Sequence, residues 1–107
     1  NGDLFVTGTV SAQSDERFKE NWRPVAEDFV YRIPEVKHGV FDRTDRNITQ
    51  VGVSAQSLEK LLPEAVITSS DGIKTVAYGN AALVAAIKLA EKVVELEARI
   101  AELEKKQ

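Results

Sequence analysis

The chain has 107 residues, of which 43% are hydrophobic, which suits one small folded domain. Its formal net charge of −3 argues against nucleic acid as the main partner, because phosphate binding needs a basic face. The sequence has no Cys and a single His, which excludes disulfides and a thiol nucleophile and argues against a metal site. No apolar run is long enough to span a membrane, and no cofactor is indicated.

The first residues change character abruptly at Ser14. Residues 1–13 carry alternating apolar positions and predict a strand. The charged segment SDERFKEN follows at 14–21, where Ser14 and the two acids after it suit a helix N-terminus. Pro24 is expected to end such a helix early. Residues 25–33 fit either a strand or a short helix, and the pattern does not separate the two.

The middle of the chain predicts short strands and one short helix. Residues 38–41 and 48–53 are expected to be strands on either side of a polar turn at 42–47. Gly52 indicates a close approach by another part of the chain. The polar stretch 32–50 is interpreted as an arm that reaches along a partner.

A capped helix and a second hairpin follow. Ser54 is expected to cap a short helix at 55–64, with its leucines on one side and Pro63 near its end. Residues 66–68 and 73–78 predict a hairpin across an SSDG turn.

The last third predicts a helix at about 80–105, preceded by Gly79 and Asn80. Its apolar residues alternate spacings of four and three, which is the heptad repeat of a coiled coil. The seam consists of Ala82, Ala86, Leu89, Val93, Leu96, Ile100 and Leu103. These residues fit two or three strands, and a single helix docked on its own domain is the alternative. A second stripe at Leu83, Ile87, Ala90 and Val94 is expected to let the first half of the helix pack on the domain.

Three segments together resemble one known family. SDERFKEN at 14–21 resembles the S-D-x-R-x-K-x-N signature of the peptidase S74 family, the intramolecular chaperones of phage tail fibres, tailspikes and endosialidases. VGVSAQSLEKLLPEAV at 51–66 resembles the family's G-x-x-A-Q-E-x-x-x-x-x-P-E-x-V segment, and residues 71–100 resemble its D-G-x-x-x-V-x-Y segment and terminal helix. Phe18 stands where Leu is common, and Ser57 where Glu is common.

The resemblance implies a self-cleaving homotrimer that helps an upstream β-fibre to fold. Residues 1–13 would end the client fibre, and residues 14–107 would form the chaperone, which separates at the Gln13–Ser14 bond. The implied nucleophile is Ser14 and the implied base is Lys19. Cleavage is expected during phage assembly in the host cytoplasm, so the client would remain in the virion tail. A trimerisation module of a fibre protein that never cleaves is the alternative.

The chemistry places demands on the Ser14–Lys19 pair. Lysine acts as a base only when neutral, so its pKa must fall by about 3 to 4 units from about 10.4; burial in an apolar pocket can supply that shift, and neighbouring carboxylates oppose it. The neighbouring acids must therefore point away or pair with Arg17 and Arg23. Residues five apart lie about 140° apart on an α-helix. Either Ser14 is the N-cap of a reorganised turn or the partner comes from another subunit, and we expect the pair to become competent only in the trimer.

The remaining side chains have less defined roles. Asn21 and Arg17 are supporting residues of the site, where Asn21 either orients the pair or caps a turn. Trp22 is expected to anchor a core or an interface, and His38 to be structural or exposed. The predicted fold is α+β, with a small mixed domain of short strands and helices followed by a long helix that forms a trimeric coiled coil.

Overall fold

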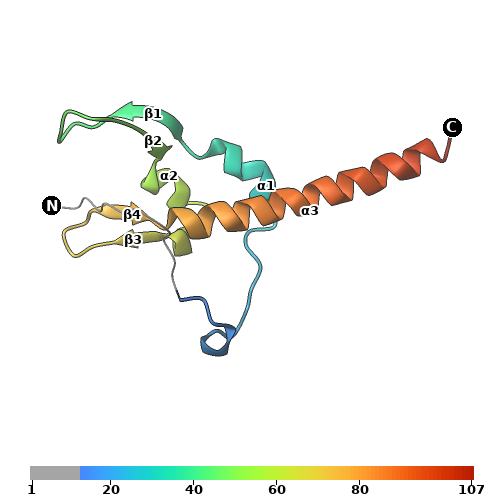
Figure 1. The fold of residues 1–107 in the computed structure, drawn as a ribbon, viewed down its shortest axis with the longest axis horizontal. Coiled ribbons are helices and arrows are strands. Elements are labelled where there is room, and N and C mark those ends of the chain that lie inside the picture. Colours follow the sequence, from blue (N-terminus) through green and yellow to red (C-terminus); the bar gives the residue numbers. More distant parts are fainter. Residues whose placement is uncertain (1–12) are drawn as a thin grey trace.

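The chain forms two small antiparallel sheets, several short helices and one long C-terminal helix (Figure 1). This computed structural model describes residues 13–107. The α+β class expected from the sequence is therefore confirmed, whereas the trimeric coiled coil stays a prediction. The strand expected in residues 1–13 lies outside the described residues except for Gln13.

The first hairpin pairs β1 (His38–Asp42) with β2 (Thr49–Val53) and extends from the body as an arm (Figure 1). Val40 lies opposite Val51, and both side chains are exposed. The predicted strands and the polar turn between them are confirmed. The stretch 32–50 is thus partly an ordered strand pair and partly helix, and not a loop throughout.

The second hairpin pairs β3 (Val66–Thr68) with β4 (Lys74–Val76). Gly72 closes its turn at a φ of 87°, in the left-handed region that a residue without a side chain enters most readily. The hairpin expected here is confirmed, but its second strand ends at Val76. Tyr78, which the sequence assigns to that strand, is the first residue of the long helix instead.

Two short helices complete the mixed domain. The ambiguous segment 25–33 forms helix α1 (Phe29–Arg32), which continues into a 3-10 turn at Ile33–Glu35. Helix α2 (Ala55–Glu59) is capped as predicted, because Ser54 Oγ accepts a hydrogen bond from the Ser57 backbone N–H at 3.1 Å. It ends earlier than expected, and a separate 3-10 turn follows at 63–65.

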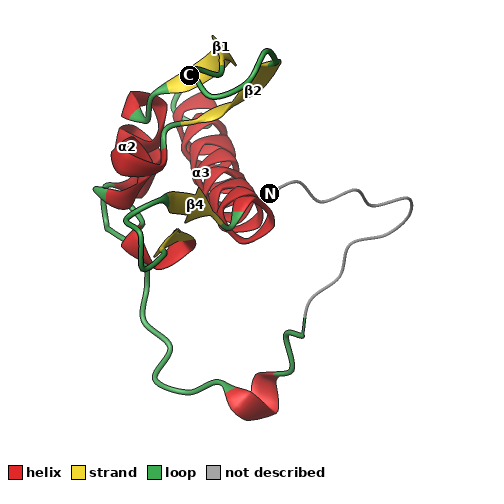
Figure 2. Cartoon of the chain, turned by 90° about the vertical axis from the view of Figure 1, so that its left-hand side faces the viewer, coloured by secondary structure: helices red, strands yellow, loops and turns green. Residues whose placement is uncertain are grey.

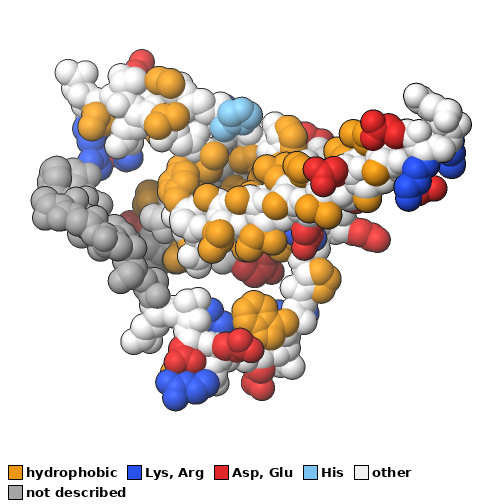
Figure 3. Space-filling model, turned by 45° about the vertical axis from the view of Figure 1, so that its right-hand side comes forward, with side chains coloured by type: hydrophobic (Ala, Val, Ile, Leu, Met, Phe, Trp, Pro, Cys, Tyr) orange, Lys and Arg blue, Asp and Glu red, His pale blue; other side chains and the backbone are white. Residues whose placement is uncertain are grey.

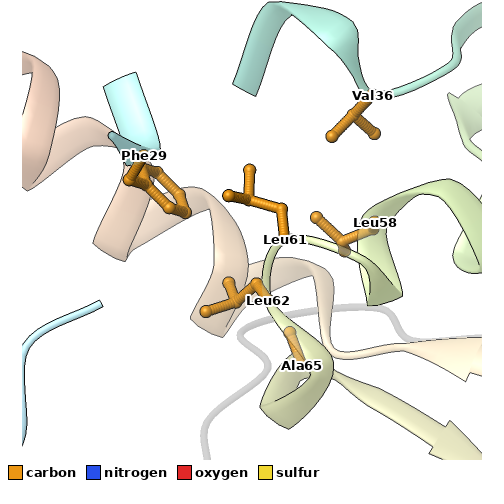
Figure 4. Close-up of a cluster of buried hydrophobic side chains, with 6 residues drawn as sticks. All are labelled: Phe29, Val36, Leu58, Leu61, Leu62 and Ala65. Atoms are coloured by element: carbon orange, nitrogen blue, oxygen red, sulfur yellow. The ribbon is translucent and has the colours of Figure 1, made fainter. Parts of the chain in front are cut away.

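A small hydrophobic core joins these elements beside the first turns of the long helix (Figure 4). Its buried residues are Phe29, Val36, Leu58, Leu61, Leu62 and Ala65. The leucines expected on one side of α2 and its continuation thus point inward. Because a domain this small buries limited apolar area, association with further chains would add to its stability.

The long helix α3 (Tyr78–Glu104) begins two residues earlier than predicted, so Gly79 and Asn80 lie inside it. Ala81 and Ala85 contact the core. The stripe that begins at Leu83 and Ile87 stays exposed, so our expectation that it packs on the domain is wrong. The small alanine side chains allow a close approach to the domain that the larger residues would prevent.

The heptad seam is also exposed along the single chain. Its large residues Leu89, Val93, Leu96, Ile100 and Leu103 are between 45% and 62% accessible. The helix thus docks on its own domain through Ala81 and Ala85, whereas the seam stays exposed within one chain. Within residues 13–107 we find no helix long and apolar enough to cross a membrane.

Candidate functional site

The segment 13–24 stands apart from the body of the domain, and every residue in it is exposed (Figure 2). A 3-10 turn occupies Glu16–Phe18. Its N-cap is Asp15, whose Oδ1 accepts a hydrogen bond from the Arg17 backbone N–H at 2.9 Å. The sequence predicts Ser14, near the helix start, as such a cap. Since Asp15 caps the turn instead, the Ser14 hydroxyl is available for another contact.

That contact is with Lys19. Lys19 Nζ donates to Ser14 Oγ at 2.5 Å and to the Ser14 carbonyl oxygen at 3.2 Å. A regular helix would keep these residues apart, but here the backbone is extended at both Asp15 and Lys19, on either side of the short turn. Neither arrangement expected from the sequence is met in full, because one chain brings the pair together through a reorganised turn whose N-cap is Asp15 and not Ser14.

The acidic neighbours of the pair are partly neutralised. Arg17 donates to both carboxylate oxygens of Asp15, with its Nη2 at 2.8 Å from Oδ2. These hydrogen bonds hold the pKa of Asp15 below its ordinary value. Arg17 thus pairs with one of the neighbouring acids, whereas its supporting role at the site stays a prediction. Arg23 does not pair in this way here, since it donates to the Asn21 carbonyl oxygen at 2.8 Å.

Asn21 and Trp22 follow Lys19 along the chain, and Trp22 contacts its side chain. Asn21 has a φ of 57°, a left-handed conformation that Asn adopts more readily than most residues. The chain bends there, and the Trp22 ring lies 5.9 Å from Lys19 Nζ, within reach of a cation–π interaction. Trp22 is 72% exposed and is not a core residue. No pattern in the sequence directly indicated its contact with Lys19.

The remaining candidates lie elsewhere. His38 Nδ1 lies 2.6 Å from the Val36 carbonyl oxygen at the start of β1, which fits the structural role expected for it. The coiled-coil seam is carried by α3, far along the chain from the pair. No group of three or more His, Cys, Asp or Glu residues that could hold a metal occurs in the described part of the chain.

Comparison with known proteins identifies the family. Residues 14–67 match the family model Peptidase_S74, described as the chaperone of endosialidase. The chain belongs to this family. The matched region begins at Ser14 and includes Lys19, both hairpin strands of the arm and the core-forming 55–65 segment. The resemblance seen in the sequence is therefore confirmed.

The similar full-length proteins are phage tail fibres. The long tail fiber protein Gp37 of Enterobacteria phage K3 is 32% identical over 99% of this chain, and Gp37 of Enterobacteria phage T2 has the same identity and coverage. The chain spans only 9% of the length of each relative. The chain is therefore similar to a short part of two phage tail fibre proteins.

Proposed function

We propose that this chain is the intramolecular chaperone of a fibre protein, acting as a homotrimer on an upstream client domain and then releasing itself at the Gln13–Ser14 bond. The observation that carries the proposal is the contact of 2.5 Å between Lys19 Nζ and Ser14 Oγ, at the residue where the family match begins. The tail-fibre relatives support a fibre as the client. Release during phage assembly would leave the client in the virion tail.

The reaction requires Lys19 to become neutral. Lys19 Nζ then takes the proton of the Ser14 hydroxyl while Oγ attacks the carbonyl carbon of Gln13. The peptide C–N bond breaks, the proton passes to the departing Ser14 amine, and an ester joins Gln13 to Ser14 Oγ. Water then opens the ester and leaves a carboxyl group on Gln13 and a hydroxyl group on Ser14. No cofactor is required.

Solvent exposure explains how cleavage could depend on assembly. Exclusion of water favours the neutral form of lysine, whereas the whole 13–24 segment is exposed in one chain. The pair is already joined within that chain, so a second subunit need not supply a partner residue. We infer that trimer formation contributes the missing burial, which would make cleavage follow correct assembly.

The decisive experiment is mass spectrometry of the freshly expressed chain, searching for a new N-terminus at Ser14. The substitution Lys19→Arg keeps a cation within reach of Ser14 but cannot supply a neutral base, since arginine stays charged. We expect Ser14→Ala and Lys19→Arg each to slow cleavage by at least about 100-fold. Ser70→Ala, which changes an exposed serine in the β3–β4 turn, should leave the rate unaltered.

Two outcomes would contradict parts of the proposal. An intact chain both with and without Ser14→Ala would favour a trimerisation module that never cleaves. Equal cleavage rates above and below the concentration at which the trimer dissociates would show that assembly does not control the pair. Circular dichroism of each variant would establish that the fold is retained.

A further inference from the structure

Helix α3 has three distinct faces between residues 81 and 94. In the heptad that the seam defines, Val93 and Ile100 occupy a positions and Leu89 and Leu96 occupy d positions. The same register places Ala85 and Lys92 at g positions. Figure 3 shows hydrophobic side chains gathered along this helix.

The helix's own domain covers the flank on the g side. Ala81 and Ala85 contact the core, and Lys92 Nζ lies 5.2 Å from the ring of Tyr31 on α1. The side chains of Lys88 and Lys92 are only 33% and 24% accessible. Past Lys92, every residue of α3 is exposed. The contact with the domain therefore lasts about three helical turns and then stops.

The flank on the e side carries an apolar stripe that nothing in the single chain covers. It consists of Leu83, Ile87, Ala90 and Val94, at e and b positions. Leu83 and Val94 are 64% and 67% exposed. At the next e positions the residues are Glu97 and Glu104, so the stripe ends at the level where the domain on the opposite flank also ends.

The charges farther along α3 indicate what lies beside this flank. In a parallel coiled coil, a g residue of one helix faces the e residue five positions later on its neighbour. Here that rule pairs Lys92 with Glu97 and Arg99 with Glu104, and both pairs have opposite charge. One heptad nearer the domain, the same rule pairs Ala85 with Ala90, and both of these residues are small and apolar.

We propose that the stripe Leu83, Ile87, Ala90 and Val94 is the docking surface for the globular domain of a neighbouring copy of this chain. The inference rests on the proposed homotrimer, in which rotational symmetry makes the helices parallel and in register. In each chain, the chain's own domain covers the g flank of the helix. The e flank of that helix faces the g flank of the neighbouring helix. The stripe therefore meets the neighbour's domain at the same level, which explains why both end together.

Tyr31 lies on the part of the domain that faces the proposed contact. It is 68% exposed although it sits against Lys92 at the g flank. Across a parallel interface the flanking e positions of the adjacent helix are Ala90 and Glu97, and Val94 lies between them at a b position. The ring of Tyr31 would then be covered by the aliphatic stripe of the neighbour, and the apolar area exposed on both would be removed from water.

Cross-linking tests this contact directly, because the chain has no Cys of its own. We expect the double variant Tyr31→Cys/Val94→Cys, treated with a short bis-maleimide, to give covalently linked dimers and trimers. Links within one chain are disfavoured, since Val94 lies about 200° around the helix from Lys92, which Tyr31 contacts. The control is Ile67→Cys/Val94→Cys, because Ile67 is similarly exposed but lies on β3, beside the start of α3 (Figure 1).

A second pair of variants tests the same surface by affinity. Val94→Glu should raise the concentration at which the trimer half-dissociates by about tenfold or more, because the charge would enter an apolar contact. Ile67→Glu should leave that concentration unchanged. A trimer that forms no Tyr31–Val94 links and tolerates Val94→Glu would overturn the docking surface alone. A monomeric wild-type chain in light scattering would overturn the proposed homotrimer itself.

Discussion

The contact between the first hairpin and the start of α3 depends on a glycine. A Cβ atom added at Gly52 would lie 2.6 Å from Tyr78 Oη, well inside contact distance. The same hydroxyl accepts a hydrogen bond from the Val53 backbone N–H at 3.1 Å. Tyr78 thus links β2 to the long helix. The absence of a side chain at Gly52 leaves room for the Tyr78 hydroxyl group.

The substitution Gly52→Ala should therefore destabilise the domain by about 1 to 3 kcal/mol, the usual cost of overpacking. Tyr78→Phe alone should cost about 1 kcal/mol through loss of the hydrogen bond to Val53. In the Tyr78→Phe background the nearest atoms to the new methyl group are Phe41 Cε2 at 3.5 Å and the ring carbon of residue 78 at 3.6 Å, which are ordinary contacts. There Gly52→Ala should be neutral, or stabilising by about 0.5 kcal/mol.

Urea denaturation of the four proteins, all at one chain concentration, gives the free energy of unfolding for this double-mutant cycle. We expect the two substitutions to be non-additive by at least about 1 kcal/mol, with the double variant more stable than the sum predicts. Additive costs would refute the reasoning, because they would mean that the Tyr78 hydroxyl does not occupy the space above Gly52.

Two further predictions concern the core and the turn of the first hairpin. Phe29→Ala should lower the free energy of unfolding by about 3 to 5 kcal/mol, since Phe29 is 1% exposed. The exposed control Ile67→Ala should change that free energy by less than about 0.5 kcal/mol. Equal losses in the two variants would contradict the observed core. Hydrogen bonds from Arg43 lower the pKa of Asp45 to about 2, which an NMR titration of its carboxyl carbon should show. Because the folded-state pKa is depressed, the resulting stabilisation is present above the ordinary value of about 3.9 and is lost as the pH falls through about 2. Titration near the ordinary value would show that the pair with Arg43 does not persist in solution.

Local signals in the sequence determined much of the fold. The Ser54 cap, the two hairpins and the long heptad helix depend on residue preferences and periodicities that act over a few neighbouring positions, and each forms near the predicted place. The S-D-x-R-x-K-x-N segment, together with the two motifs that follow it, likewise indicates the family from residue identities alone. Element boundaries follow less closely from such signals, as the start of α3 at Tyr78 shows.

Tertiary structure decided what spacing alone could not. Helical spacing set Ser14 and Lys19 apart, yet the short turn capped by Asp15 brings their side chains into contact. The apolar stripes of α3 were visible in the sequence, but which flank the domain covers depends on contacts between segments far apart along the chain. Periodicity shows that a face is apolar, whereas only the packed arrangement shows which faces remain for another subunit.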